Sequence, residues 1–438
     1  MKSSRENFYF VITVNSLVSV GCFNEYTDMT IELFVYLSED TLNAKILINM
    51  RKMRLGICMA LLCCMTGCKN KTQENCSADN ATEQLTGDFD KRMDVLFAKG
   101  FSIENYDRYK KVSIINPENT KDTIQKYILY TKGINTDSIN VDDAIYIQVP
   151  IRSMACMSTS VLGMMPILGL NDKIAGVGNS KYVYDNDIVA KIDSGYIKNI
   201  SDGMSKNYEQ IIMLHPDILV VDDYSSDAKD KDLTDAGINV MYMNNWKEPN
   251  VLGRAEWMKV MALLFGETRK ADSIFDDIVN RYEEVKKEIG TLKDTVNVIW
   301  GMDFKGVWYV PGEYSYVTQL LGDAGCRFEY EKGAKNSTPY PLELIFSRHK
   351  KTRIWLCQPS DKIKSVGDMV NTNEKYKYFD AVNNGKIYSD RKRIGRNGGN
   401  DIWESGVYRP DILLKDIAKI SHPELFPDYE LVYWYEMK

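Results

Sequence analysis

Apolar runs typical of buried strands alternate with helix-like segments through the middle of the chain. IRSMACMS (151–158) and IAGVG (174–178) predict strands, and VLGMMPILGL (161–170) predicts a helix between them that bends near Pro166. YEQIIMLHPDILVV (208–221) predicts a helix and then, after its proline, a buried strand. Strands that alternate with helices at this spacing favour a parallel α/β sheet.

The clearest helix lies at 269–289, where apolar side chains recur three and four positions apart. Thr268 is expected to cap this helix, which is long enough to join two lobes. After Gly290 the alternation restarts, with strand-like VNVIWG, TRIWLC and GKIYS and helix-like YVTQLLGDAG and RPDILLKDIAKI. The sequence therefore predicts an α/β fold in which two lobes with mainly parallel sheets are joined by a long helix.

A β-rich segment precedes the first lobe. KKVSIINP and QKYILYT are typical of strands and are separated by a polar link. We therefore expect a β-rich N-terminal extension packed on the domain that follows. The expected organisation is the β-rich extension at 88–147, an N-terminal lobe at 148–250, a helical connector at 251–289 and a C-terminal lobe at 290–438.

The early part of the chain contains a secretory pattern. Basic residues within 51–54 precede the apolar run LGICMALLCCMTG, which ends at Cys68. A short basic region, an apolar core and small residues before a cleavage site form such a signal. The segment MTGC (65–68) resembles the bacterial lipobox, which implies that Cys68 is lipidated and becomes the mature N-terminus.

This pattern divides the first part of the chain into three segments. We expect a lipoprotein signal peptide at 50–67 and a flexible polar tether at 68–87. Translation is expected to begin at Met50 or Met53, with 1–49 an upstream segment misassigned to the protein.

Charge and motif content argue against nucleic-acid binding and against catalysis. The net charge of −6 gives no general reason to expect a nucleic-acid partner. No GxSxG, HExxH, P-loop or GxGxxG motif occurs in the sequence. None of the three histidines, His215, His349 and His422, neighbours another, so we expect no protein-ligated metal and no cofactor. Haem held by histidine is disfavoured as well, whereas ligation of haem by tyrosine or methionine stays open.

Several segments together resemble one family of binding proteins. YEQIIMLHPDILVV (208–221), MMPILGLNDKIAGVG (164–178) and YSYVTQLLGDAG (314–325) are similar, in order and spacing, to helical-backbone periplasmic binding proteins. That family serves ABC importers of iron–siderophore complexes, haem and cobalamin. The run GNDIWESGVYRPDILLKDIAKISHPELFP (399–427) is similar to a lipoprotein branch found in Bacteroidetes-like bacteria. The resemblance covers 148–430 and implies reversible ligand capture without enzymatic chemistry.

The resemblance also implies partners and a location. Its members hold the ligand between the lobes, and a glutamate on each lobe docks on arginines of the ABC transporter permease. Glu209 and Glu343 match these two positions. The alternative is that both are ordinary solvated carboxylates, which the N-terminal end of a helix favours in any case. The protein is expected in the cell envelope, held to a membrane by its lipid and facing the periplasm or exposed at the surface.

Cleft residues are expected in loops after the C-terminal ends of strands, where open α/β sheets usually bind ligands. This rule selects Met157, Tyr182, Tyr184, Tyr224, Trp246, Trp308 and Tyr309. Aromatic walls suit large flat ligands, although each side chain alone is more typical of a core or surface position.

The loop DRKRIGRNGGNDIW (390–403) gathers basic residues in an acidic chain. Arginine forks suit carboxylates, phosphates or the anionic oxygens of a ferric catecholate, whereas the alternative is a solvated basic loop. The expected contacts from this region are Arg391, Arg393, Arg396, Trp403 and Arg409. The expected metal-chelate ligand is a ferric siderophore first, cobalamin second and haem third.

Overall fold

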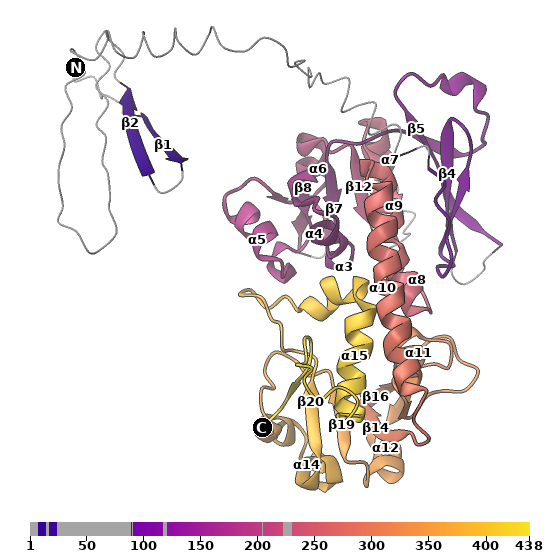
Figure 1. Ribbon diagram of the computed structural model, residues 1–438, viewed down its shortest axis with the longest axis vertical. Helices are drawn as coiled ribbons and strands as arrows, with labels where there is room; N and C mark the ends of the chain where they lie inside the picture. Colours follow the sequence, from indigo (N-terminus) through magenta and orange to yellow (C-terminus); the bar gives the residue numbers. More distant parts are fainter. Residues whose placement is uncertain are drawn as a thin grey trace, which may run out of the picture. The chain divides into compact units, whose positions relative to one another are not determined.

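The computed structural model describes residues 8–14, 17–23, 89, 91–116, 121–203, 205–221 and 230–438. The chain divides into two compact units, 1–76 and 77–438. In the first unit, β1 (Phe8–Val14) pairs antiparallel with β2 (Leu17–Phe23) (Figure 1). The expected lipid-anchor residue Cys68 and the expected cleft residue Tyr224 lie outside the described residues. No helix in the described part of the chain is both long and apolar enough to cross a membrane.

Five parallel strands form the sheet of the N-terminal lobe. In spatial order they are β13 (Asn239–Tyr242), β12 (Ile218–Val221), β7 (Met154–Cys156), β8 (Ile174–Val177) and β9 (Lys198–Asn199). The helices around this sheet are α3 (Thr159–Leu162), α4 (Met164–Leu168), α5 (Asn186–Asp193), α6 (Tyr208–Leu214) and α7 (Asp230–Asp235). A short hairpin of two-residue strands, β10 (Ser201–Asp202) and β11 (Ser205–Lys206), precedes α6. The strands expected within 151–158, 174–178 and 208–221 are confirmed.

The helix expected at 161–170 is instead two short helices, and the break falls at Gly163 rather than near Pro166. Gly163 is both the C-cap residue of α3 and the N-cap residue of α4. A Cβ at Gly163 would lie 2.0 Å from the backbone oxygen of Glu404, so a side chain has no room there. Pro166 fits the first turn of α4, where a backbone N–H has no partner within the helix.

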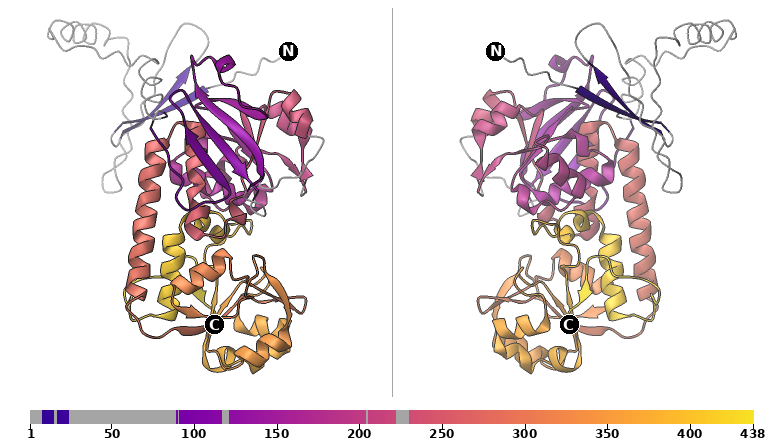
Figure 2. Two further views of the ribbon diagram at one scale, coloured as in Figure 1. Left: turned by 90° about the vertical axis from the view of Figure 1, so that its right-hand side faces the viewer. Right: turned by 90° about the vertical axis from the view of Figure 1, so that its left-hand side faces the viewer.

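Three helices join the lobes: α8 (Val251–Glu256), α9 (Met258–Phe265) and α10 (Thr268–Ile289). Figures 1 and 2 show α10 running from the N-terminal to the C-terminal lobe beside α15 (Pro410–Ser421). The apolar face of α10 is buried as its periodicity predicts. The prediction that Thr268 caps α10 is wrong, because Glu267 is the cap residue and the Thr268 hydroxyl is buried without a partner in the described part of the chain.

The C-terminal lobe repeats the α/β pattern. Its sheet runs β17 (Cys326–Arg327), β14 (Val296–Trp300), β19 (Ile354–Cys357), β20 (Lys386–Ser389) and β21 (Tyr435–Glu436), parallel except for the last pair. A smaller antiparallel sheet contains β15 (Asp303–Phe304), β16 (Val307–Val310) and β18 (Thr338–Pro341). The lobe's other helices are α11 (Tyr316–Asp323), α12 (Leu342–His349), α13 (Val366–Thr372) and α14 (Asp380–Asn384). The predicted two-lobed α/β fold is therefore confirmed.

The β-rich extension is a four-stranded sheet of β3 (Phe101–Asn105), β4 (Tyr109–Ile115), β5 (Thr123–Thr131) and β6 (Ala144–Val149). The pairs β3–β4 and β4–β5 are antiparallel, and β5–β6 is parallel. The Tyr127 hydroxyl lies against the edge strand of the N-terminal lobe, because it donates to Val240 O at 3.0 Å. The extension is thus packed on that lobe.

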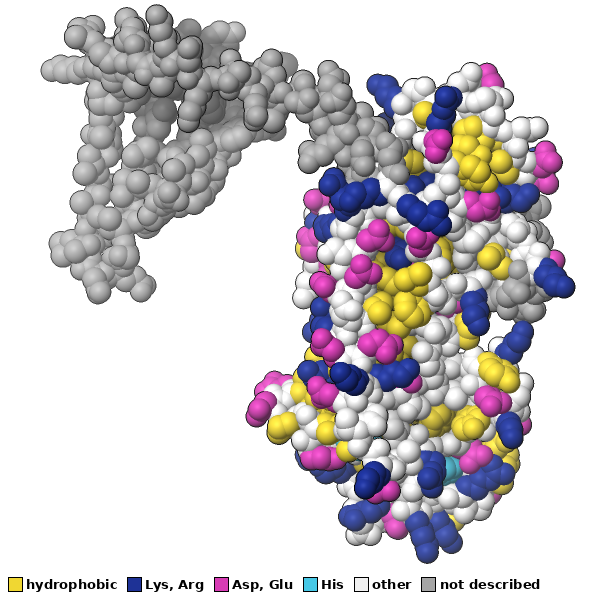
Figure 3. Space-filling model, turned by 45° about the vertical axis from the view of Figure 1, so that its right-hand side comes forward, with side chains coloured by type: hydrophobic (Ala, Val, Ile, Leu, Met, Phe, Trp, Pro, Cys, Tyr) yellow, Lys and Arg dark blue, Asp and Glu magenta, His cyan; other side chains and the backbone are white. Residues whose placement is uncertain are grey.

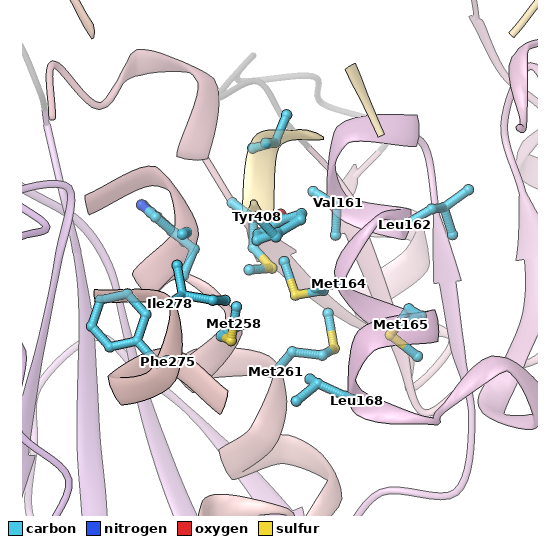
Figure 4. Packing of buried hydrophobic residues seen from close by; sticks show 14 of the residues in the cluster. Val161, Leu162, Met164, Met165, Leu168, Met258, Met261, Phe275, Ile278 and Tyr408 are labelled. Atoms are coloured by element: carbon cyan, nitrogen blue, oxygen red, sulfur yellow. The ribbon is translucent and has the colours of Figure 1, made fainter. Parts of the chain in front are cut away.

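One apolar core is continuous from the extension through the connector into the C-terminal lobe. Figure 4 shows Tyr408, from the C-terminal part of the chain, among Val161 and Met164 of the N-terminal lobe and Met258 of the connector. Methionine side chains adapt to irregular gaps of this kind. The shared core holds the two lobes and the connector together as one body.

Candidate ligand-binding site

A pocket opens where the connector meets the C-terminal ends of β14 and β19. Its lining comes from α8, α11, α15, the ends of those strands, the segment just before α15 and the residue just before β21. The lining residues are Arg254, Trp300, Tyr316, Leu320, Gln358, Ile402, Trp403, Val407, Leu413, Ile417 and Trp434. The space measures about 390 Å³ with its open mouth included. Its position matches the general rule for open α/β sheets.

Arg254 is the one charged side chain among the described residues that line this pocket. It is 7% exposed, its Nε donates to Asn245 O at 3.3 Å, and its guanidinium carbon lies 4.0 Å from the centre of the Tyr316 ring. Stacking on an aromatic face holds a guanidinium flat and leaves its remaining N–H groups for other acceptors. The pocket therefore offers a fixed positive charge in apolar surroundings.

Tryptophans form much of the remaining wall. Trp300 and Trp434 lie with ring centres 5.8 Å apart, and Trp403 is 40% exposed at the rim. The indole nitrogen of Trp434 is buried and has no hydrogen-bond partner in the described part of the chain. A buried donor without a partner is unfavourable, so a ligand acceptor that reached it would gain a strong contact. The wall thus consists largely of flat apolar faces, and this donor is buried within it.

A carboxyl group lies directly behind this wall. The Gln358 amide approaches Asp390 Oδ2 at 3.5 Å, and burial raises the pKa of Asp390 to about 7, with Arg391 acting against that shift. A group with this pKa changes charge near neutral pH. Gln358 lines the pocket and its amide donates to Asp390, so the charge state of Asp390 acts on a side chain of the pocket wall.

Residues 393–408, which we call the interlobe strap, leave the C-terminal lobe and contact the N-terminal lobe. Glu404 is 2% exposed, and its carboxylate accepts the backbone N–H of Tyr184 at 2.8 Å and of Asp185 at 2.9 Å. Burial raises the pKa of Glu404 to about 7, against these two hydrogen bonds. A Cβ at Gly399 would lie 2.2 Å from Tyr182 O. The strap thus meets the N-terminal lobe through a buried carboxylate and through a close approach of the two backbones.

The arginines expected to face an anionic ligand contact carboxylates of the protein. Arg391 lies 2.7 Å from Asp361, Arg393 lies 2.5 Å from Asp401, Arg409 lies 2.9 Å from Asp411, and Arg396 pairs with Asp193. Burial acts to raise the pKa of Asp411, but hydrogen bonds from Arg409 and Arg281 outweigh it and lower that pKa. The positive charge of the basic loop is therefore balanced within the chain.

The other expected cleft residues are dispersed. Tyr184 lies in the strap contact, with the Arg393 guanidinium 5.2 Å from its ring centre. Tyr182 and Trp246 are both 47% exposed, after β8 and β13, and Met157 follows β7. The structure does not gather these side chains around the pocket of Trp300 and Trp434.

Two expected cleft residues lie on β16, in the smaller sheet of the C-terminal lobe. Trp308 is 2% exposed, and its indole N–H donates to Trp300 O at 3.0 Å, which places it in the core of that lobe. Its neighbour Tyr309 is 52% exposed and points to the opposite face of the strand. Of the residues named from sequence, Trp403 lines the pocket itself.

The two expected docking glutamates are both on exposed helix starts. Glu209 lies in the first turn of α6, which Asn207 caps. Glu343 lies in the first turn of α12, and its carboxylate accepts from Lys375 at 2.6 Å, which lowers the pKa of Glu343. Glu343 would have to exchange this lysine for a partner's arginine in any docking contact.

Sequence reasoning missed Arg254, Trp300, Tyr316 and Trp434. Trp300 is the last residue of β14, so the rule of strand ends could have found it. Arg254 has no comparable signal, because it lies within a connector helix whose orientation depends on tertiary packing. Among the described residues, no group of three or more His, Cys, Asp or Glu side chains could hold a metal ion.

The fold and the pocket together define a two-lobed binding protein. Residues 154–394, more than half of the chain, match the family model described as periplasmic binding protein. The chain belongs to this family of solute-binding proteins, whose members are not enzymes. The β-rich extension lies outside the matched residues.

The chain is also similar to individual proteins and solved structures. Two uncharacterized lipoproteins of Methanocaldococcus jannaschii are 24% and 25% identical to this chain, covering 84% and 72% of it and 92% and 81% of their own lengths. The triscatecholate siderophore-binding protein FeuA of Bacillus subtilis matches with a TM-score of 0.46 and 19% identity, over 64% of this chain and 96% of its own. The periplasmic haem-binding protein HutB of Vibrio cholerae matches with a TM-score of 0.48 and 14% identity, over 60% and 98%.

Proposed function

We propose that this chain is the substrate-binding lipoprotein of an ABC importer. It captures an iron–siderophore complex in the cleft between its lobes and delivers it to the permease. The main support is the pocket in which Arg254, stacked on Tyr316, faces the same space as Trp300 and Trp434. Aromatic faces bind the flat rings of a chelator, and a desolvated guanidinium binds its anionic oxygens.

Cobalamin is the second candidate, and the pairing of the basic loop supports it. Arg391, Arg393, Arg396 and Arg409 each contact a carboxylate, so Arg254 is the charge that remains for the ligand. A ligand with few anionic oxygens suits such a wall better than a highly charged one. Haem is the third class in the test below.

The ligand class is tested by visible absorption. The full-length protein is mixed with a ferric catecholate siderophore, cobalamin or haem, separated from free ligand by gel filtration, and its spectrum recorded. We expect the ferric charge-transfer band to stay with the protein, and Arg254→Gln to weaken retention about tenfold. Arg396→Gln is the matched control, since Arg396 pairs with Asp193 outside the pocket, and it should retain the ligand. Retention of cobalamin alone would replace the siderophore assignment.

Membrane attachment and delivery are tested separately. The lipoprotein relatives support lipidation at Cys68, so Cys68→Ser should release the protein from the membrane fraction. Glu209→Arg combined with Glu343→Arg should abolish import while leaving ligand retention unchanged, because both glutamates lie outside the pocket. Intact import in that double variant would contradict permease docking and favour a surface lipoprotein that scavenges ligand for an outer-membrane receptor.

A further inference from the structure

We infer that the β-rich extension positions Arg254 in the ligand pocket by fixing the short helix α8. Arg254 and Glu256 are two residues apart on this six-residue helix. Arg254 contacts the pocket, whereas Glu256 contacts the extension. The importance of Arg254 for ligand rests on the proposed function, but its placement does not.

Two buried carboxylates hold the loop that leads into β3. Glu256, which is 0% exposed, accepts the backbone N–H groups of Leu96 at 2.8 Å, Phe97 at 2.7 Å and Ala98 at 2.9 Å. Glu248, just before α8, accepts those of the next two residues, Lys99 and Gly100. Five successive backbone donors are thus bound by the connector region. Hydrogen bonds to a charged acceptor are about twice as strong as neutral ones.

The same contact is closely packed. A Cβ at Gly253 would lie 3.1 Å from both Ala98 Cα and Phe97 O, so the helix backbone rests directly on the loop of the extension. The Trp257 indole N–H donates to Glu248 at 3.1 Å, and its ring lies 4.8 Å from that of Phe101. These close contacts therefore fix the position of α8 against the extension.

The opposite side of α8 touches the C-terminal lobe. The Val251 N–H donates to Gln319 of α11 at 3.1 Å, and Arg254 stacks on Tyr316 of the same helix. Because α8 is short and is contacted from both sides, a shift at Gly253 or Glu256 moves Arg254 relative to Tyr316. The extension, which lies outside the family match, therefore acts as a brace for a pocket residue.

The test reads the position of Arg254 directly. In full-length protein labelled with ¹⁵N-arginine, the Tyr316 ring shifts the Arg254 Nε–H resonance, which Arg254→Lys identifies by its loss. Tyr316→Leu gives the position of that resonance without the ring. We expect Glu256→Gln and Gly253→Ala, each shown to be folded by circular dichroism, to move the resonance at least half of the way to the Tyr316→Leu position. Glu104→Gln is the matched control, because Glu104 lies on β3 and pairs with Lys111 at 2.6 Å, away from α8.

An affinity measurement with ferric tris(catecholate) accompanies the resonance. Both α8 variants should bind this probe about tenfold more weakly than wild type, and Glu104→Gln should bind it equally well. A resonance that stays in place in either folded α8 variant would overturn the inference, whatever its melting temperature. If wild type itself fails to bind the probe, the proposed siderophore function fails, and the resonance still decides the positioning role.

Discussion

The interlobe strap should make the stability of this protein depend on pH through Glu404. Burial raises the pKa of this carboxyl from 4.5 to about 7, so the folded chain holds a proton there that the unfolded chain has released. Between these two values the folded state binds more protons than the unfolded state. The free energy of unfolding therefore falls as pH rises through this window and no longer changes above it.

The size of the effect follows from the shift. About 2.5 pH units correspond to about 3 kcal/mol, at a slope of about 1.4 kcal/mol per pH unit. Glu404→Gln removes this titration and keeps one oxygen for one of the two backbone donors, Tyr184 N–H and Asp185 N–H. The donor that faces the new amide is left unpaired, which costs about 1–3 kcal/mol. The variant is therefore less stable near pH 5 but recovers relative to wild type as pH rises.

Urea unfolding followed by tryptophan fluorescence measures this difference. The gap in unfolding free energy between wild type and Glu404→Gln should change by about 1.4 kcal/mol per unit between about pH 5 and about pH 7. Asp390→Asn should add a similar change, because burial raises the pKa of Asp390 from 3.8 to about 7. A gap for Glu404→Gln that is constant from about pH 5 to about pH 8 would refute the reasoning, since the carboxyl would then titrate elsewhere.

Two further predictions follow from the packing of the site. Gly163→Ala should destabilise the fold by about 1–3 kcal/mol in urea unfolding, because its Cβ would lie 2.0 Å from a backbone oxygen of the strap. Gly322→Ala is the matched control on α11, because a Cβ at Gly322 meets nothing within 4 Å, and it should raise the free energy of unfolding by about 0.5–1 kcal/mol. A change of the same sign in both variants would contradict the packing argument. Trp434→Phe should weaken ligand binding about tenfold in titration calorimetry, because it removes a donor with no partner in the described structure. It should also lower stability in urea unfolding, because Trp434 is 1% exposed and the smaller ring leaves a cavity. Unchanged affinity would mean that the indole N–H does not reach the ligand.

The sequence predicted the lobes well because their signals are local. Buried strands such as Ile218–Val221 read as short apolar runs, and α10 buries the face that its spacing predicts. The cap of α10 and the break at Gly163 were predicted incorrectly. The break at Gly163 depends on a contact with a distant part of the chain, the backbone of Glu404, which no local pattern records.

The pocket was harder to predict than the fold. The rule of strand ends reaches Trp300, yet it also selected Trp308, which lies in the lobe's core on the separate, smaller sheet. Arg254 is determined by how α8 is held between the extension and α11, and this is a tertiary relation. Aromatic side chains serve cores and clefts equally, so their identity alone does not separate the two.

The basic loop shows why charge in a sequence is a weak guide to a ligand. Arg396 and Asp193 are both about half exposed, with 57% and 51% of their side-chain surfaces accessible, and such pairs contribute about 0–1 kcal/mol. Figure 3 shows positive and negative side chains interspersed over one face of the molecule, as pairing of this kind requires. The strap is therefore held mainly by the Glu404 hydrogen bonds and by glycine contacts that leave no space for a side chain. Under the proposed function, selection of the ligand therefore falls to the side chains that line the pocket, among which Arg254 is the one charged residue in the described part of the chain.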